Sequence, residues 1–277
     1  LKKHFKDKNK FIELIKSLYP YDYAVNGDGN TESYKILKKE LNFKVHQFKE
    51  KKELNGWVVP RNQIVKKAII KSGEKIILDH SNEPLGLILC CSPFKGKVSL
   101  KKLKNHLFYH SVDSNAIPFH CIKQYNQHKI DWGFCVPKNF YKSLNKNSYD
   151  IDIQINYKKS NMKVFEYSLK GKSKKTIVIQ AHNCHPYQAN DDLSGIAVAI
   201  RLMQYLKNKK NYYTYKIIIS PELTGTIFWL NKINSKEIIA SIILPACGNK
   251  NSLKLQETFT SNTFLDSAAH DILKKNT

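Results

Sequence analysis

Arginine is nearly missing from this sequence, although the chain is strongly basic. Only Arg61 and Arg201 occur among its 46 lysine and arginine residues, and the net charge at pH 7 is +23. Proteins that read bases and phosphates favour the bidentate guanidinium of arginine, and the lysines here are scattered rather than gathered in one stripe. We therefore expect a solvated lysine surface and no nucleic-acid partner.

Paired cysteines and long apolar runs are missing as well. The six cysteines show no C-x-x-C spacing, and no segment approaches the ~18 consecutive apolar residues of a membrane helix. The sequence has no secretory signal peptide, begins with Leu1 rather than Met, and stops within a helix-like segment. These features predict a cytoplasmic protein without a membrane partner, and they are compatible with a fragment of a longer chain.

The pattern of apolar and polar residues changes twice along the chain. Residues 1–42 carry two helical patterns, the first of which ends at Pro20. Residues 43–136 are short β-rich runs separated by turn residues, which is typical of an inserted antiparallel subdomain. Residues 137–277 begin with two alternating runs, expected to form a hairpin, and continue with strands that alternate with helices. That alternation predicts an α/β core around a largely parallel sheet.

Metal-capable side chains crowd one loop, TIVIQAHNCHPYQANDDLSG, at residues 176–195. The segment begins with a predicted strand, and the metal-capable side chains come at its end. Functional groups in such sheets gather at the carboxyl ends of strands. Glu222 comes directly after the next predicted strand. Imidazole and carboxylate together suit zinc. We therefore expect His185 and Asp191 as metal ligands, and Glu222 as the proton acceptor for a metal-activated water.

Plainer roles compete with these assignments. His182 lies nearer the strand than His185 and could replace it as a ligand. Glu222 could bind the metal instead of accepting a proton. Asp191 or its neighbour could simply cap the helix that follows. Cys184 is expected to be a small buried residue rather than a ligand.

Several stretches together resemble a known family. In chain order from about residue 26 they are GDGNTESYKILKKEL, WVVPRNQIVKKAII, GEKIILD, KVSLKKLKNHL, IPFHCIKQYNQHKIDWGFCVP, CHPYQANDDLSGIAVA, PELTGTIFWL and LDSAAHDILKK. The chain is similar to bacterial aminopeptidase-like proteins that are related to the zinc exopeptidases and are often encoded with surface-polysaccharide genes. The resemblance implies a zinc-exopeptidase-like core with an inserted β-rich subdomain, and zinc ligation by His185 and Asp191.

The sequence departs from the family pattern in two places. Zinc exopeptidases carry two consecutive glutamates after their second strand, one as base and one as ligand, whereas this chain has Pro221 and Glu222. One zinc ion is therefore expected rather than two. Family members also continue past the end of this sequence, and the later segment is expected to supply another acidic group and a final histidine ligand. His270, the one histidine after the cluster, is expected to lie on a helix face.

Two functions of different classes follow from these residues. The first is a zinc-dependent aminopeptidase-like hydrolase of peptide or amide bonds, active if the chain continues beyond residue 277. Its substrate would be a small peptide or amide, and the chain could form a homo-oligomer. The second is a catalytically degenerate relative that binds a glycan or an amino-sugar precursor in surface-polysaccharide biosynthesis. The single glutamate, Glu222, favours this second function.

Overall fold

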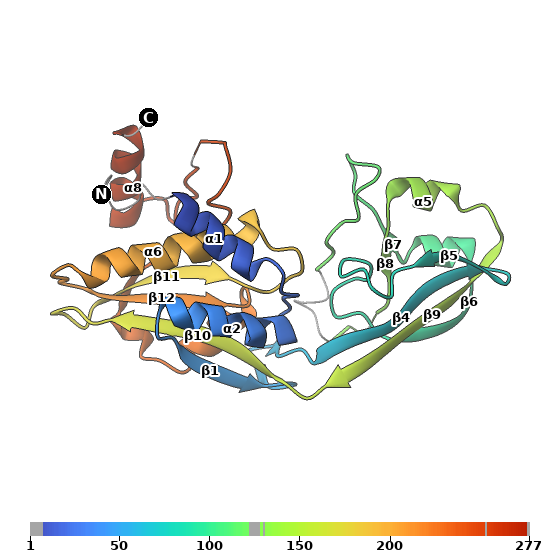
Figure 1. Cartoon of the computed structure of the whole chain (residues 1–277), viewed down its shortest axis with the longest axis horizontal. Coiled ribbons are helices and arrows are strands. Elements are labelled where there is room, and N and C mark those ends of the chain that lie inside the picture. The colour runs from blue at the N-terminus through green and yellow to red at the C-terminus, as the bar shows by residue number, and fades with distance from the viewer. Residues whose placement is uncertain (1–7, 122–127, 130, 253, 276–277) are drawn as a thin grey trace.

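The two larger β-sheets divide the chain into two lobes that lie side by side along the long axis of the molecule (Figure 1). The computed structural model describes residues 8–121, 128–129, 131–252 and 254–275. We call the lobe with helices on both faces of its sheet the core lobe. The other, which contains the sheet formed between residues 62 and 158, is called the second lobe.

The core lobe contains a five-stranded mixed sheet. Its strands, in spatial order, are β1 (Lys44–Lys49), β10 (Asn161–Leu169), β12 (Thr214–Ser220), β11 (Thr176–His182) and β13 (Ile238–Ile243). β11 pairs in parallel with β12 and β13, whereas β1, β10 and β12 are antiparallel neighbours. The predicted α/β class is confirmed, but the sheet is parallel only where helices cross over between consecutive strands.

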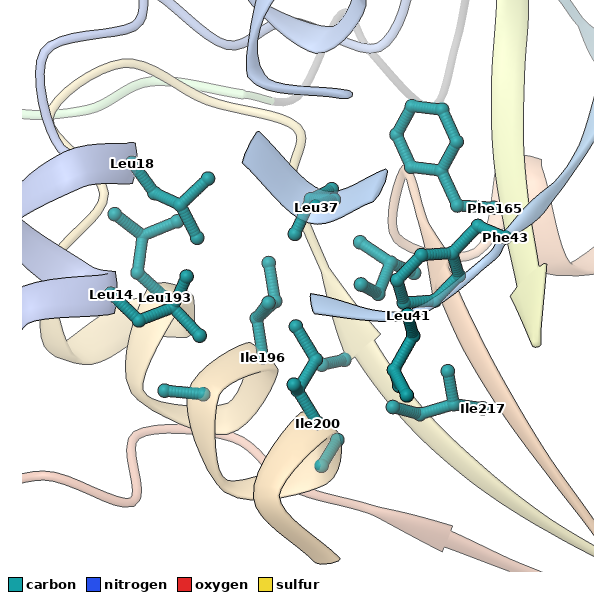
Figure 2. Close-up of a cluster of buried hydrophobic side chains, with 14 of the residues drawn as sticks. Leu14, Leu18, Leu37, Leu41, Phe43, Phe165, Leu193, Ile196, Ile200 and Ile217 are labelled. Carbon is teal, nitrogen blue, oxygen red and sulfur yellow. The ribbon is translucent and has the colours of Figure 1, made fainter. Parts of the chain in front are cut away.

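Helices cover both faces of this sheet. α1 (Lys8–Leu18), α2 (Asp28–Glu40) and α6 (Gly195–Lys207) lie on one face, and α7 (Thr224–Leu230) lies on the other. Successive strand residues point to opposite faces, so Ile217 belongs to the cluster of the first face and Ile218 to that of the second. Figure 2 shows the first cluster, in which leucines of α1 and α2 face isoleucines of α6.

After β13 the chain continues to the last helix. The short turn η2 (Ser235–Glu237) precedes β13, and α8 (Phe264–Lys274) follows it. Thr263 and Asp266 form a capping box that starts α8. No helix within the described residues is long and apolar enough to cross a membrane.

The second lobe is an antiparallel sheet with its own core. Its strands, in spatial order, are β5 (Lys75–Asp79), β4 (Asn62–Ser72), β9 (Ser148–Lys158) and β6 (Phe94–Ser99). Its shorter elements are β7 (Leu107–Phe108), β8 (Phe134–Cys135), α3 (Leu100–Lys104) and α5 (Lys138–Ser143), and the small pair β2 (Glu53–Leu54) and β3 (Trp57–Val58) precedes it. Phe134 and Ile151 are among its fully buried side chains.

The two lobes are joined by chain segments that connect a strand of one sheet to a strand of the other. The alternating runs after residue 150 do not form the expected hairpin, because β9 pairs with β4 in the second lobe while β10 pairs with β1 in the core lobe. Sheet membership therefore changes between β1 and β4 and again between β9 and β10. The domain boundaries expected at residues 43 and 136 stay predictions, since turn composition reveals where a strand ends but not which sheet it joins.

Candidate metal site

Three side chains of the loop after β11 come together at the carboxyl end of the core sheet. His182 is the last residue of β11, His185 follows in the loop, and Asp191 lies in the irregular turn η1 (Asn190–Ser194) that leads into α6. One ligand atom from each side chain lies within 4.8 Å of the other two. The strand-end loop singled out in the sequence thus brings two imidazoles and a carboxylate into one small group.

His182 is buried, and both nitrogens of its ring have close neighbours. Its Nε2 lies 2.8 Å from Asp191 Oδ1, and its Nδ1 lies 3.3 Å from Gln188 Nε2 and 3.5 Å from Cys184 Sγ. Burial lowers the pKa of His182, but hydrogen bonds with Asp191 and Cys184 outweigh it and raise the pKa to about 11. The ring therefore carries a proton at the nitrogen where a metal cation would compete with it.

The ring of His185 contacts the backbone instead. Its Nδ1 donates to the carbonyl oxygen of Pro186 over 2.9 Å, and because a carbonyl can only accept, the ring proton sits on Nδ1. Nε2 then offers a lone pair, 3.5 Å from Asp191 Oδ2. Phe119 of the second lobe packs against this ring, with centroids 4.9 Å apart. The backbone contact thus selects the tautomer that a metal ligand needs.

The two consecutive aspartates have different surroundings. Asp191 is more than half exposed, and its hydrogen bond with His182 is the largest of the causes that hold its pKa well below the ordinary value. Asp192 is fully buried, and its Oδ2 accepts the backbone N–H of His182 at 3.0 Å. Burial raises the pKa of Asp192 to about 7. Asp192 therefore ties η1 to the end of β11, and Ser194 takes the N-cap position of α6 that the sequence left open to an aspartate.

The glycine that follows the aspartates is required by a close approach. A Cβ atom on Gly195 would lie 2.0 Å from the carbonyl oxygen of Leu244 and 2.3 Å from Asp192 Oδ1. No other residue fits between these two oxygens without a shift of the backbone. Gly195 therefore allows α6 to begin directly beside the buried carboxylate.

Glu222, the predicted proton acceptor, follows the neighbouring strand. The last residue of β12, Ser220, pairs with His182 in parallel register, so Glu222 leaves the sheet at the same edge. Its side chain is exposed. Within the described residues it lies outside the group formed by the two histidines and Asp191, and its role as a base stays a prediction.

The other candidates have partners of their own. Cys184 is buried in the apolar cluster on the α7 face of the sheet, as expected for a small core residue. His270 lies on α8, where its Nε2 pairs with Glu257 Oε1 at 2.5 Å. The loop after β13 also reaches the site, because the N–H of Gly248 donates to Asn190 Oδ1 at 2.7 Å.

Sequence reasoning missed the residues that support the metal-capable loop from a distance. Gln188 contacts His182 from within the loop, and Phe119 approaches His185 from the second lobe. Asn30, in the Gly-rich segment at the start of α2, donates to the backbone carbonyl of Asn183 at 2.6 Å. That segment was noticeable for its glycines, but nothing in its spacing indicates a contact with a loop about 150 residues later.

The fold and the strand-end group together define an aminopeptidase-like α/β protein. A solved structure from Clostridium acetobutylicum, described as a peptidase, matches with a TM-score of 0.80 at 22% identity, over 98% of this chain and 64% of that one. A zinc aminopeptidase from Bacillus subtilis matches with a TM-score of 0.69 at 13% identity, over 96% and 76%. At these identities the likeness shows a shared fold.

The chain belongs to the family described as "Domain of unknown function (DUF4910)", which matches residues 12–277. A curated relative from Clostridium acetobutylicum is 25% identical over 268 residues, and its name describes polysaccharide biosynthesis and an aminopeptidase-like domain. The alignment covers 95% of this chain and 61% of that relative, so the chain spans less than two thirds of the relative's length. The resemblance to aminopeptidase-like proteins is confirmed.

Proposed function

We propose that this protein is a zinc-dependent hydrolase that acts on the peptide or amide bond of a small substrate. The observation that carries the proposal is the convergence of His182, His185 and Asp191 at the end of β11. Two imidazoles and a carboxylate form a frequent ligand set of catalytic zinc, which keeps a further position for water. The zinc aminopeptidase of the same fold supports this choice of metal.

The donor atoms fit a single ion. Both histidines turn Nε2 toward Asp191, His182 at 2.8 Å from one carboxylate oxygen and His185 at 3.5 Å from the other. Because Pro186 holds the His185 proton on Nδ1, Nε2 and the facing oxygen of Asp191 are both acceptors. A cation shared by these atoms would satisfy both. We therefore propose one zinc ion with three protein ligands rather than two ions.

The chemistry of the chain's own residues follows from their positions. A zinc ion at this group would lower the pKa of a coordinated water to about 7. We propose Glu222 as the general base, because it leaves the same sheet edge as His182 and its carboxylate is exposed to a substrate. It would accept the proton of the attacking water and pass it to the leaving amine. Asp192 holds the backbone of His182 and so orients that ligand.

Metal content tests the ligand set. After zinc loading, the protein should retain about one zinc ion per chain by elemental analysis. Asp191→Asn and His185→Ala should each lose most of it, because two protein ligands hold zinc poorly. His270→Ala removes a histidine outside the group and should keep the metal, which makes it the matched control. Full zinc retention in Asp191→Asn would contradict the assignment.

The second candidate is a non-hydrolytic relative that binds a glycan or an amino-sugar precursor. The single glutamate at the end of β12 supports it, as does the name of the Clostridium relative. Aminoacyl p-nitroanilides separate the two functions. The hydrolase should cleave at least one of them, and Glu222→Gln should retain zinc while losing roughly 100-fold in rate. Zinc-loaded protein that cleaves none of them but binds a glycan would favour the second candidate.

The same proposal extends to the compartment. None of the six cysteines, all of which lie in the described part of the chain, forms a disulfide bond, and thiols persist in reducing surroundings. We therefore propose that the protein works in the cytoplasm.

A further inference from the structure

Asn30, in the first turn of α2, is a buried amide that contacts two segments of the chain. The residue is 3% exposed. Its Nδ2 donates to the backbone carbonyl of Asn183 at 2.6 Å, and its Oδ1 accepts the backbone N–H of Ala24 at 3.3 Å. Since one contact needs a donor and the other an acceptor, no side chain of this size other than an amide satisfies both.

The carbonyl that Asn30 contacts lies between the two histidines of the metal-capable loop. Asn183 follows His182, the last residue of β11, and precedes His185 by two positions. Its N–H donates to the carbonyl oxygen of Ser220 at 3.3 Å. Ser220 ends β12, two residues before Glu222. Both backbone groups of Asn183 are therefore used, one toward α2 and the other toward the loop of the candidate base.

The side chain of Asn183 takes no part in these contacts. It is fully buried, and neither its Nδ2 nor its Oδ1 has a hydrogen-bond partner among the described residues. A buried backbone carbonyl is costly to leave unpaired, and Asn30 supplies a donor to this one from a segment 153 residues earlier in the chain. The link between α2 and the metal-capable loop therefore depends on the identity of Asn30.

The segment that carries Asn30 is itself closely packed. A Cβ atom on Gly29 would lie 2.1 Å from the carbonyl oxygen of Asp22, so the start of α2 lies directly against the chain that precedes it. Ala24, whose N–H Asn30 accepts, lines a cavity of about 410 Å³ between the two lobes, and so does Pro186 of the metal-capable loop. Asn30 therefore connects two segments that line the same cavity.

We propose that Asn30 is a positioning residue of the metal group. Its bond to the Asn183 carbonyl holds the backbone between the two candidate histidine ligands, and the contact of Asn183 with Ser220 fixes that backbone relative to Glu222. Replacing a residue that orients metal ligands without touching the metal costs roughly 10- to 100-fold in metal affinity or activity. The inference rests on the proposed zinc site, but the hold on the loop can be measured without metal.

Asn30→Asp tests the bond itself. An aspartate keeps the size of the side chain and can still accept the N–H of Ala24, but it cannot donate to the Asn183 carbonyl. In competition with a chelator, the variant should bind zinc roughly 10- to 100-fold more weakly than the unmodified protein. Hydrogen exchange measured in EDTA should be faster in residues 183–190. Ser33→Ala, which removes a buried hydroxyl from the same helix, is the matched control and should change neither.

The two measurements separate failure of this proposal from failure of the proposed function. If Asn30→Asp lowers the melting temperature but leaves loop exchange and zinc affinity as in Ser33→Ala, Asn30 only stabilises the fold and the proposal is wrong. Unchanged zinc affinity in Asn30→Asp, in a protein that binds zinc, also overturns it. If the unmodified protein binds no zinc, the proposed function fails, and the exchange comparison alone decides whether Asn30 holds the loop. Should Asn30→Asp not fold, Asn30→Ala, which also lacks the donor, takes its place in both measurements.

Discussion

Gly195 lies where the start of α6, the buried carboxylate of Asp192 and the backbone after β13 meet. The space for its missing side chain is already filled by two oxygen atoms, that of Leu244 and one of Asp192. The Asp192 carboxylate in turn holds the backbone of His182. One residue without a side chain therefore connects the packing of the core to the position of a candidate ligand.

Replacing this glycine should disturb both stability and the site. Gly195→Ala brings its Cβ to 2.0 Å from a backbone oxygen, which forces α6 or the loop after β13 to move. We expect a loss of about 1–3 kcal/mol in the free energy of unfolding, measured by urea denaturation, and a lower zinc content. Gly96→Ala is the matched control, since its Cβ would meet only the Phe94 ring, at 3.7 Å. If the two variants are equally stable, the protein accommodates the Cβ atom added at position 195 without losing stability, and the prediction is wrong.

At the candidate site, the sequence predicts those residues whose positions follow from the order of neighbouring elements along the chain. A strand followed by His182, His185 and Asp191 is visible because strand ends and turn residues have local signatures. The supporting contacts of Asn30 and Phe119 come from segments far away in the chain. No periodicity reports such contacts, because they depend on how two sheets are placed in space.

β1, β10, β12 and α7 meet around one buried carboxylate on the second face of the core sheet. Glu166 of β10 accepts hydrogen bonds from His46 Nε2 and Trp229 Nε1, both at 2.8 Å, and pairs with Lys216 at 3.0 Å. Its side chain is 9% exposed. Burial opposes ionisation, but the hydrogen bonds from His46, Trp229 and Lys216 hold the pKa of Glu166 well below its ordinary value. The carboxylate of Glu166 therefore links β10 to β1, β12 and α7.

This shift predicts a pH dependence of stability. A carboxylate with a lowered pKa in the folded state stabilises the fold above its unfolded pKa, about 4.3, and this contribution is lost as the pH falls toward the folded pKa. Glu166→Gln should therefore cost roughly 3 kcal/mol at pH 7, and the difference from the unmodified protein should shrink below about pH 4. Urea denaturation at several pH values measures it, with exposed Glu74→Gln as the control. A difference that is constant from pH 7 to pH 3 would contradict the role assigned to this charge.

The order of elements in the core could be predicted from the sequence where it is local. The run from β11 through α6, β12 and α7 to β13 shows the expected alternation of strands and helices. The strand partners of β1 and β9 could not be predicted from the sequence. β1 pairs with β10 more than 100 residues later, and β9 pairs with β4 in the second lobe. Alternating side chains identify a strand but not its partner.

Over the whole molecule, the second lobe reaches the candidate metal site of the core lobe. Its Phe119 packs against the ring of His185, with ring centroids 4.9 Å apart. The lobes are joined by the chain segments between β1 and β4 and between β9 and β10, and Asp28 at the start of α2 contacts both Asn62 and Lys158. The exposed ion pair of Asp28 with Lys158 is worth little on its own.

The contact between Phe119 and His185 allows this cooperation between lobes to be measured. Phe119 is 41% exposed, so Phe119→Ala should change the global unfolding free energy little. An aromatic pair is worth about 0.5–1.5 kcal/mol, so loss of the ring should weaken zinc affinity roughly two- to tenfold by releasing the orientation of His185. Competition with a chelator measures that affinity, and Phe259→Ala, at a fully exposed phenylalanine, is the control. If zinc affinity is the same in both variants, the second lobe does not position the metal group.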